Sequence, residues 1–256
     1  MSKETQQLAP LCASVQRDNT LGIMLSLFMP GLRLDKHAVK LQYNQGGGGC
    51  FPIHFDSDEA VDTRRITSII YLNPDWRPGN GGELRLYPFP AHPVDIEPRH
   101  DRMVLFSSMR MAHRVLPSNA ERYCFTIWLS DTRKLPQRLS KEQLRSLLAN
   151  VENLGAAEAC ELLQHPAVYK HAVKWAHRHE WAQSIADSHP PSSARQELLD
   201  RFWREVGVIE RALGPLLAVA ERASRAAPAA AAAAGGQAST AWEDAPPGNQ
   251  LRPTWF

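Results

Sequence analysis

The stretch Arg122-Tyr-Cys-Phe-Thr-Ile-Trp-Leu129 has the period of a β-strand, with Cys124, Thr126 and Trp128 on the same face as Arg122. Other short segments with strand character, separated by Gly- and Pro-containing turns, surround it. The predicted strands cover residues 37–43, 50–56, 65–73, 83–87, 103–107, 111–116 and 122–129. This number of short strands in about 90 residues predicts a mainly β fold, a sandwich or jelly roll.

Outside this β-rich part the periodicity is helical. The apolar run from Leu21 to Pro30 predicts a helix or a buried strand, and Ser140-Lys-Glu-Gln143 is a capping box before another helical pattern. Gly214-Pro215 should break or kink the last helix. The predicted organisation is an N-terminal helical segment at 1–36, a β core at 37–131, a helical region at 132–225 and a disordered Ala- and Pro-rich tail at 226–256.

Composition excludes several classes of protein. Of the 256 residues 43% are hydrophobic and 22% are charged, as in a soluble globular protein, and the net charge of +2 gives no support to a nucleic-acid binder. The four cysteines lack the spacing of a disulfide framework or a zinc site. The apolar run near the start is too short to cross a bilayer. We therefore expect a cytoplasmic or nuclear protein without a membrane segment.

His54 and Asp56 are the first candidate ligands. Residues i and i+2 of a strand project to the same face, so both side chains can bind one ion. His113, in another predicted strand, would complete a set of two imidazoles and one carboxylate, which holds Fe(II) and leaves coordination positions open. An H-x-D pair alone is weak evidence, so the prediction depends on its context.

Arg122 supplies that context. An arginine on the inner face of a sheet is costly to bury unless it meets an anion, and its planar fork binds a carboxylate with two parallel hydrogen bonds. Beside an iron site, the natural ligand is an acid that chelates the metal at one end and needs a cation at the other. 2-Oxoglutarate has that shape.

The segment from Tyr43 to Ser130 resembles the catalytic domain of the 2-oxoglutarate- and Fe(II)-dependent prolyl 4-hydroxylases, and is most similar to the intracellular, oxygen-sensing type. The matching blocks are Ile66-Thr-Ser-Ile-Ile-Tyr-Leu-Asn-Pro-Asp-Trp76, Gly81-Gly-Glu-Leu-Arg85, Asp95-Ile-Glu-Pro98 with Asp101-Arg102, and His113 through Arg122-Tyr-Cys-Phe-Thr-Ile-Trp128. The resemblance covers roughly a third of the chain.

The resemblance implies a double-stranded β-helix and a role for each matching residue. His54, Asp56 and His113 would bind iron. Arg122 and Tyr71 would bind the distal carboxylate of 2-oxoglutarate. The remaining cosubstrate contacts would be Thr67, Ile69, Leu84, Thr126 and Trp128, with Tyr43 near the metal. The implied cofactors are Fe(II), 2-oxoglutarate and O2, with ascorbate as reductant. The implied reaction hydroxylates a prolyl residue of a protein or peptide and releases succinate and CO2.

Two other classes stay open. The segment from Ser57 to Arg65, which in the family helps to hold the peptide, leaves the substrate undecided. The enzyme could instead act on another side chain, a small molecule or a nucleobase. A non-catalytic jelly-roll scaffold is the second alternative, with the helical region at 132–225 as a surface for an unknown protein partner. A calcium loop at Asp56, Asp58 and Asp62 is excluded, because its sixth position is Val61 rather than Gly.

Overall fold

The computed structural model describes residues 10–58, 62–133 and 154–233, with a few isolated positions between 142 and 151. The chain forms two compact units that interleave along the sequence. The first unit contains Met1–Arg138 and His177–Arg204, and the second contains Leu139–Ala176 and Glu205–Phe256. This grouping differs from the sequential order expected from the sequence, because residues 177–204 join the β-rich unit.

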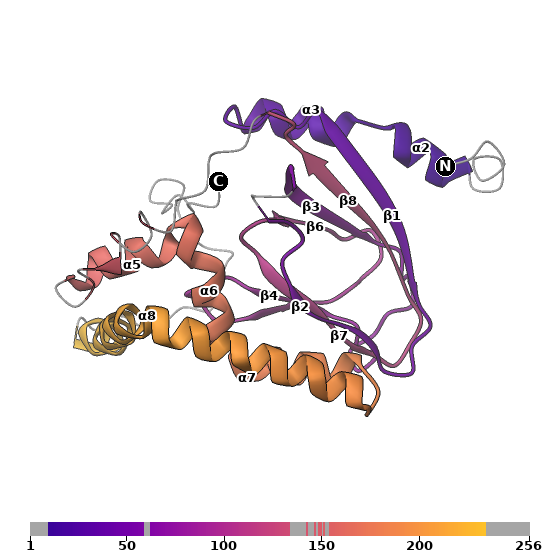
Figure 1. The fold of residues 1–256 in the computed structure, drawn as a ribbon. Helices are drawn as coiled ribbons and strands as arrows, with labels where there is room; N and C mark the ends of the chain where they lie inside the picture. Colours follow the sequence, from indigo (N-terminus) through magenta and orange to yellow (C-terminus); the bar gives the residue numbers. More distant parts are fainter. Residues whose placement is uncertain are drawn as a thin grey trace. The chain divides into compact units, whose positions relative to one another are not determined.

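Two four-stranded antiparallel sheets form the first unit (Figure 1). The first sheet has the order β1-β8-β3-β6 and the second the order β2-β7-β4-β5. The strands are β1 (Lys36–Asn44), β2 (Gly49–His54), β3 (Arg64–Tyr71), β4 (Leu84–Tyr87), β5 (Val94–Ile96), β6 (Met103–Ser107), β7 (Ala112–Ser118) and β8 (Arg122–Ser130). The predicted jelly-roll fold is confirmed.

Strand boundaries differ from the expectation in two places. β5 has no counterpart among the predicted strands, because its three residues are too few for a period to show. β2 ends at His54, so Asp56 lies beyond the strand that was expected to include it. The orientation of Asp56 is therefore decided by the turn after β2 and not by strand alternation.

The outer face of the first sheet is apolar and is covered by N-terminal helices. Ile66, Ile127 and Leu129 pack with Leu34 in a buried cluster. Partly buried residues around it include Val15, Leu21, Leu25 and Met29. They belong to or adjoin α2 (Pro10–Arg17) and α3 (Thr20–Phe28), both drawn in indigo in Figure 1. The apolar run at 21–30 thus forms the expected helix. α2 lies within the segment 1–36 that was predicted to be helical, but it was not singled out as a separate helix.

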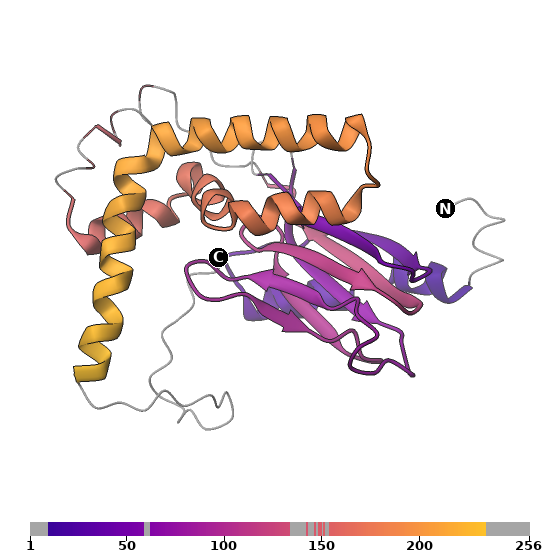
Figure 2. The ribbon, with the colours of Figure 1, turned by 90° about the horizontal axis from the view of Figure 1, so that it is seen from below.

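The outer face of the second sheet is covered by α7 (Arg178–Ser188). The amide of Ile53 in β2 donates to the Ser184 hydroxyl over 3.0 Å, and both residues are buried. On the other side of α7, Trp181 stacks on Phe202 with ring centroids 6.4 Å apart. Figure 2 shows this layering, with α7 in orange between the strands and the first turns of α8 (Ser193–Ala233).

The described part of the second unit is helical. It contains α5 (Ala156–Gln164), α6 (Pro166–Ala176) and the rest of α8 beyond Arg204. Val168, Ala172 and Val173 of α6 are buried, and Lys174 pairs with Glu205 over 2.7 Å. The capping box predicted at 140–143 lies outside the residues that the structure describes, apart from an isolated position at 142.

The sequence predicted a break or a kink at Gly214-Pro215. The helix is not broken there, because α8 continues through it, but the axis of α8 bends sharply partway along (Figure 2). Pro215 removes one intrahelical hydrogen bond, but Leu213, Leu216 and Leu217 on either side are buried. Their burial stabilises a helical path that local propensity disfavours. The helix also runs to Ala233, past residue 225 where the tail was expected to begin, because alanine is the strongest helix former.

None of the helices in the described ranges combines the length and the apolar character that a membrane crossing requires.

Candidate metal centre

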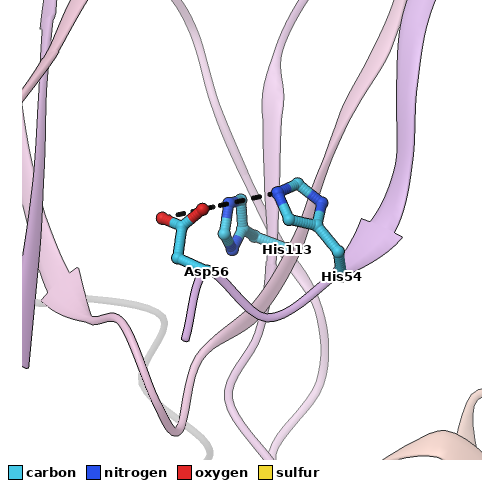
Figure 3. A group of neighbouring side chains, drawn as sticks. All are labelled: His54, Asp56 and His113. Carbon is cyan, nitrogen blue, oxygen red and sulfur yellow. Dashed lines mark ion pairs between the residues drawn. The ribbon is translucent and has the colours of Figure 1, made fainter. Parts of the chain in front are cut away.

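His54 and His113 are brought together by sheet register. They are opposite residues of the antiparallel strands β2 and β7, so their side chains project to the same face. Their ring centroids are 4.3 Å apart. Asp56 reaches the same point from the turn after β2, with Oδ1 3.5 Å from His54 Nε2 and Oδ2 3.8 Å from His113 Nε2. Figure 3 shows the three side chains converging.

Each imidazole is oriented by a backbone carbonyl. His54 Nδ1 lies 2.9 Å from the carbonyl oxygen of Pro52, and His113 Nδ1 lies 3.1 Å from that of Met111. A carbonyl only accepts, so each Nδ1 must carry the proton and each Nε2 has a free lone pair. Metal-binding histidines are held in the same way. The potential ligand atoms all lie within 4.8 Å of one another.

Burial and mutual contact set the charges of these groups. Burial, followed by the neighbouring His54, lowers the pKa of His113 to about 4, so its imidazole is neutral at pH 7. Burial would raise the pKa of Asp56, but the neighbouring His54 and His113 and the hydrogen bond from Thr67 hold it well below its usual range. Burial lowers the pKa of His54, as does the charge of Lys40, but the contacts with Asp56 and Pro52 outweigh both, so the pKa of His54 is raised above its usual value. A carboxylate beside a neutral imidazole suits a divalent cation.

Asp56 is held by residues of the first sheet. Thr67 Oγ1 donates to Asp56 Oδ2 over 2.6 Å and lies 2.8 Å from the Ser108 hydroxyl. Arg64 Nη1 donates to the backbone carbonyl of Asp56 over 3.1 Å. Thr67, predicted as a cosubstrate contact, thus orients a candidate metal ligand. Ser108 and Arg64 were not singled out from the sequence.

A second polar group lies around Arg122, which is 5% exposed at the start of β8. Its Nε donates to the Gly82 carbonyl over 2.9 Å, and its guanidinium carbon lies 5.1 Å from the Tyr71 ring centroid. The Tyr71 hydroxyl is buried and has no hydrogen-bond partner in the described chain. Burial raises the pKa of Tyr71 to about 12, so this hydroxyl keeps its proton and is a donor. A buried cation beside a buried, unpaired donor is an arrangement for an anion.

Gly82 is required for this arrangement. Its φ is +76°, which L side chains rarely adopt. A Cβ there would lie 2.9 Å from Arg122 Cδ and 2.8 Å from the Ser118 hydroxyl. Only glycine allows the backbone carbonyl to approach the guanidinium this closely.

The other predicted site residues share the inner side of the sheets. In the first sheet Thr67, Ile69 and Tyr71 of β3 are opposite Trp128, Thr126 and Cys124 of β8, so all six project to one face. In the second sheet Leu84 and Leu86 project to the same side as His113, because Leu86 is opposite it. Strand alternation therefore assigned these residues to the inner side correctly.

The predicted position of Tyr43 near the metal needs correction. Tyr43 is 53% exposed, stacks on Tyr123 with ring centroids 4.8 Å apart and donates to Glu121 over 2.6 Å. The inward residue of β1 is its neighbour Gln42, whose Oε1 accepts from Thr126 over 2.6 Å. Val39, Leu41 and Tyr43 do share a face, as predicted, but this face points away from the histidines. Only the register between β1 and β8 shows that Gln42 points inward, and this register cannot be read from the sequence of β1 alone.

Comparisons with known proteins agree with this geometry. Residues 39–130 match the model of the 2OG-Fe(II) oxygenase superfamily. The chain is 40% identical over 99 residues to a hypoxia-inducible factor prolyl hydroxylase of Caenorhabditis elegans, covering 38% of this chain and 14% of that protein. It is 35% identical over 132 residues to the prolyl hydroxylase EGLN3 of Mus musculus, covering 48% of this chain and 54% of that one.

A solved structure matches over a longer span. A prolyl 4-hydroxylase from Phytophthora capsici is 32% identical, with a TM-score of 0.67, over 87% of this chain and 74% of that one. The chain spans only about half of the mouse relative and a seventh of the nematode one. His54, Asp56, His113 and Arg122 all lie within the matched residues 39–130.

Proposed function

Because this chain belongs to the 2-oxoglutarate- and Fe(II)-dependent oxygenase superfamily and is related to its prolyl hydroxylases, we propose that it hydroxylates a prolyl residue of a protein or peptide. O2 and 2-oxoglutarate are consumed, and succinate and CO2 are released. The observation that carries the proposal is the convergence of His54, Asp56 and His113 within 4.8 Å. The alternatives are a different side chain, small molecule or nucleobase as substrate.

The donor set fits Fe(II). Two imidazoles and one carboxylate occupy one side of a metal and leave positions open for other ligands. Fe(II) bound there would supply the redox chemistry that activates O2, with 2-oxoglutarate as the source of two electrons. Ascorbate would serve as an auxiliary reductant. A scaffold without catalytic function is disfavoured, because all three candidate ligands have free ligand atoms.

The residues of the chain have distinct tasks in this proposal. Thr67 orients Asp56, and the carbonyls of Pro52 and Met111 orient the histidines. Arg122 and Tyr71 bind the distal carboxylate of 2-oxoglutarate, which satisfies the buried hydroxyl of Tyr71. Ile69, Leu84, Thr126 and Trp128 line the same side and exclude water from it. An intracellular location stays a prediction.

Succinate production from 2-oxoglutarate with Fe(II) and ascorbate tests the proposal. His113→Ala should abolish it because a ligand is lost, and Arg122→Ala should abolish it because cosubstrate binding is lost. Arg99→Ala is the matched control, since Arg99 is exposed and forms only a surface pair with Glu97. It should keep wild-type turnover.

An anaerobic titration separates binding from turnover. Fe(II) and 2-oxoglutarate should produce a metal-to-ligand absorption band in the wild type and in Arg99→Ala. The band should be absent from His113→Ala, and Arg122→Ala should require far more 2-oxoglutarate to produce it. A wild-type protein that shows neither turnover nor the band would contradict the proposed function.

A further inference from the structure

Lys40 is a residue of the inner side that the proposed chemistry does not use. It is opposite Thr126 in the register of β1 and β8, and therefore projects to the same side as Gln42. Lys40 is exposed, and its Nζ lies 5.9 Å from the centroid of the Phe51 ring. No carboxylate of the described residues lies within ion-pair distance of it.

Phe51 connects Lys40 to the metal centre. This residue of β2 is 48% exposed, and its ring centroid lies 6.4 Å from that of His54. Of the three candidate ligands His54 is the one that meets solvent, with 38% of its side chain exposed against 9% for Asp56 and 5% for His113. An exposed aromatic ring and an unpaired cation therefore lie beside the accessible part of the centre.

The other cation near the centre behaves differently. The Nε of Arg64 pairs with Asp62 over 3.2 Å, and its guanidinium carbon lies 4.6 Å from the Trp128 ring centroid. Its charge is satisfied within the chain, whereas that of Lys40 is not. Lys40 also does not share the anion of Arg122. Asn44, the register partner of Arg122, is four residues away in β1, or about 13 Å of strand.

We propose that Lys40 and Phe51 form a specificity subsite that selects protein substrates with an aspartate or glutamate close to the residue to be hydroxylated. The inference rests on the proposed function and names its substrate class more closely. The acidic side chain pairs with the Lys40 ammonium, while an apolar part of the same peptide contacts the Phe51 ring. Lys40 is a specificity residue and takes no part in the reaction itself.

A degenerate peptide library tests the subsite. Peptides with a central proline and randomised flanks are captured on the immobilised full chain, loaded with Mn(II) and 2-oxoglutarate, and are identified by mass spectrometry. On the wild type Asp and Glu should be enriched about two- to fivefold near the proline, as an exposed ion pair allows. The enrichment should vanish in Lys40→Met and change to Lys and Arg in Lys40→Glu. Lys36→Met, in the same strand, should behave as the wild type.

Three results would overturn the inference: no acidic enrichment on the wild type, the same enrichment in Lys40→Met, or no peptide retained above the bare matrix. Raising the salt concentration should weaken the enrichment, since it screens an exposed pair. The anaerobic absorption band is measured on the same samples. If the wild type lacks the band, the proposed function itself fails. If the band is present but Lys40→Met needs more 2-oxoglutarate to produce it, Lys40 belongs to the cosubstrate site and the subsite is wrong.

Discussion

The inner side of the β-rich unit and the outer face of its second sheet differ in how buried polar groups are satisfied. On the outer face of the second sheet, Arg85 Nη1 and the Tyr87 hydroxyl both donate to Glu180 of α7, over 2.7 and 2.8 Å. Arg114 Nη2 donates to Asp187 of the same helix over 2.8 Å. On the inner side, the Tyr71 hydroxyl and Trp128 Nε1 are buried without a partner in the described chain.

Polar groups that pair within the chain have a structural role, whereas buried groups left unpaired are candidates for binding a ligand. Burying an unpaired donor costs free energy, so a folded chain normally supplies its own acceptor. The outer face of the second sheet does this through α7. Three outer polar atoms are exceptions, because Nε of Arg114, Nε2 of His177 and the Ser68 hydroxyl have no partner in the described chain. The inner side leaves the donors of Tyr71 and Trp128 unpaired, the first of them beside Arg122. These donors are therefore available to a bound ligand.

The largest effect should come from breaking the outer pairing. Arg114→Met leaves the Asp187 carboxylate without its cation, and breaking a fully buried pair costs about 3 to 5 kcal/mol. Asp187 keeps 25% of its side chain exposed, so we expect a loss of about 2 kcal/mol and a melting temperature lower by about 4 to 8 °C. Thermal unfolding measures this. Arg99→Met, which loses only a surface pair, should leave the melting temperature unchanged.

The same pair has a predicted pH dependence. Burial raises the pKa of Asp187, but hydrogen bonds from Arg114 and Gln183 outweigh it and hold the pKa below its usual value. Its stabilisation is therefore full above the unfolded pKa of about 3.9 and is lost as pH falls through the lower folded pKa. The melting temperatures of wild type and Arg114→Met should converge below about pH 4. A constant difference down to lower pH would show that Asp187 is not the partner that matters.

Tyr71 and Tyr87 provide the sharpest test of this difference. Both are 0% exposed, but Tyr71 lies on the inner side and Tyr87 on the outer face of the second sheet. Tyr71→Phe should weaken 2-oxoglutarate binding about tenfold, since a hydrogen bond to a charged group is lost. It should not lower the melting temperature, because it removes a buried hydroxyl without a partner. Tyr87→Phe should do the reverse. It should lose about 1 kcal/mol of stability with its bond to Glu180 and keep wild-type affinity.

Anaerobic titration measures the affinity of each variant for 2-oxoglutarate, and thermal unfolding measures its melting temperature. Tyr71→Phe should change only the affinity, and Tyr87→Phe only the melting temperature. If Tyr71→Phe lost stability and kept its affinity for 2-oxoglutarate, the distinction between the two sides would fail.

The smallest effect is expected for Tyr43→Phe. The Tyr43 hydroxyl donates to Glu121 at the surface and the side chain points away from the centre. Both the affinity for 2-oxoglutarate and the melting temperature should equal the wild-type values within error. Gln42→Leu is the contrasting variant, because it removes the acceptor of Thr126 on the inner side. A weaker absorption band in Tyr43→Phe than in Gln42→Leu would indicate that Tyr43, and not Gln42, contributes to the site.

Local periodicity predicted much of this site, because a strand alternates with a period of two wherever it lies. It placed Thr67, Ile69 and Tyr71 together, and likewise Arg122, Thr126 and Trp128. The jelly-roll fold followed from the number and spacing of the strands. His54, Asp56, His113 and Arg122 were identified from residue type, spacing and resemblance, and these are properties of the sequence itself.

Tertiary structure alone decided which face of β1 points inward. Alternation places Val39, Leu41 and Tyr43 on one face of β1, but it does not show whether that face points to the inner or the outer side of the sheet. The buried cluster around Leu34 and Ile127 packs against Val39 on the outside, so Gln42 and Lys40 are left for the inside. Ser184 and Asp187 reach β2 and β7 from far along the chain for the same reason. Such contacts depend on which surfaces bury each other, and no local pattern records that.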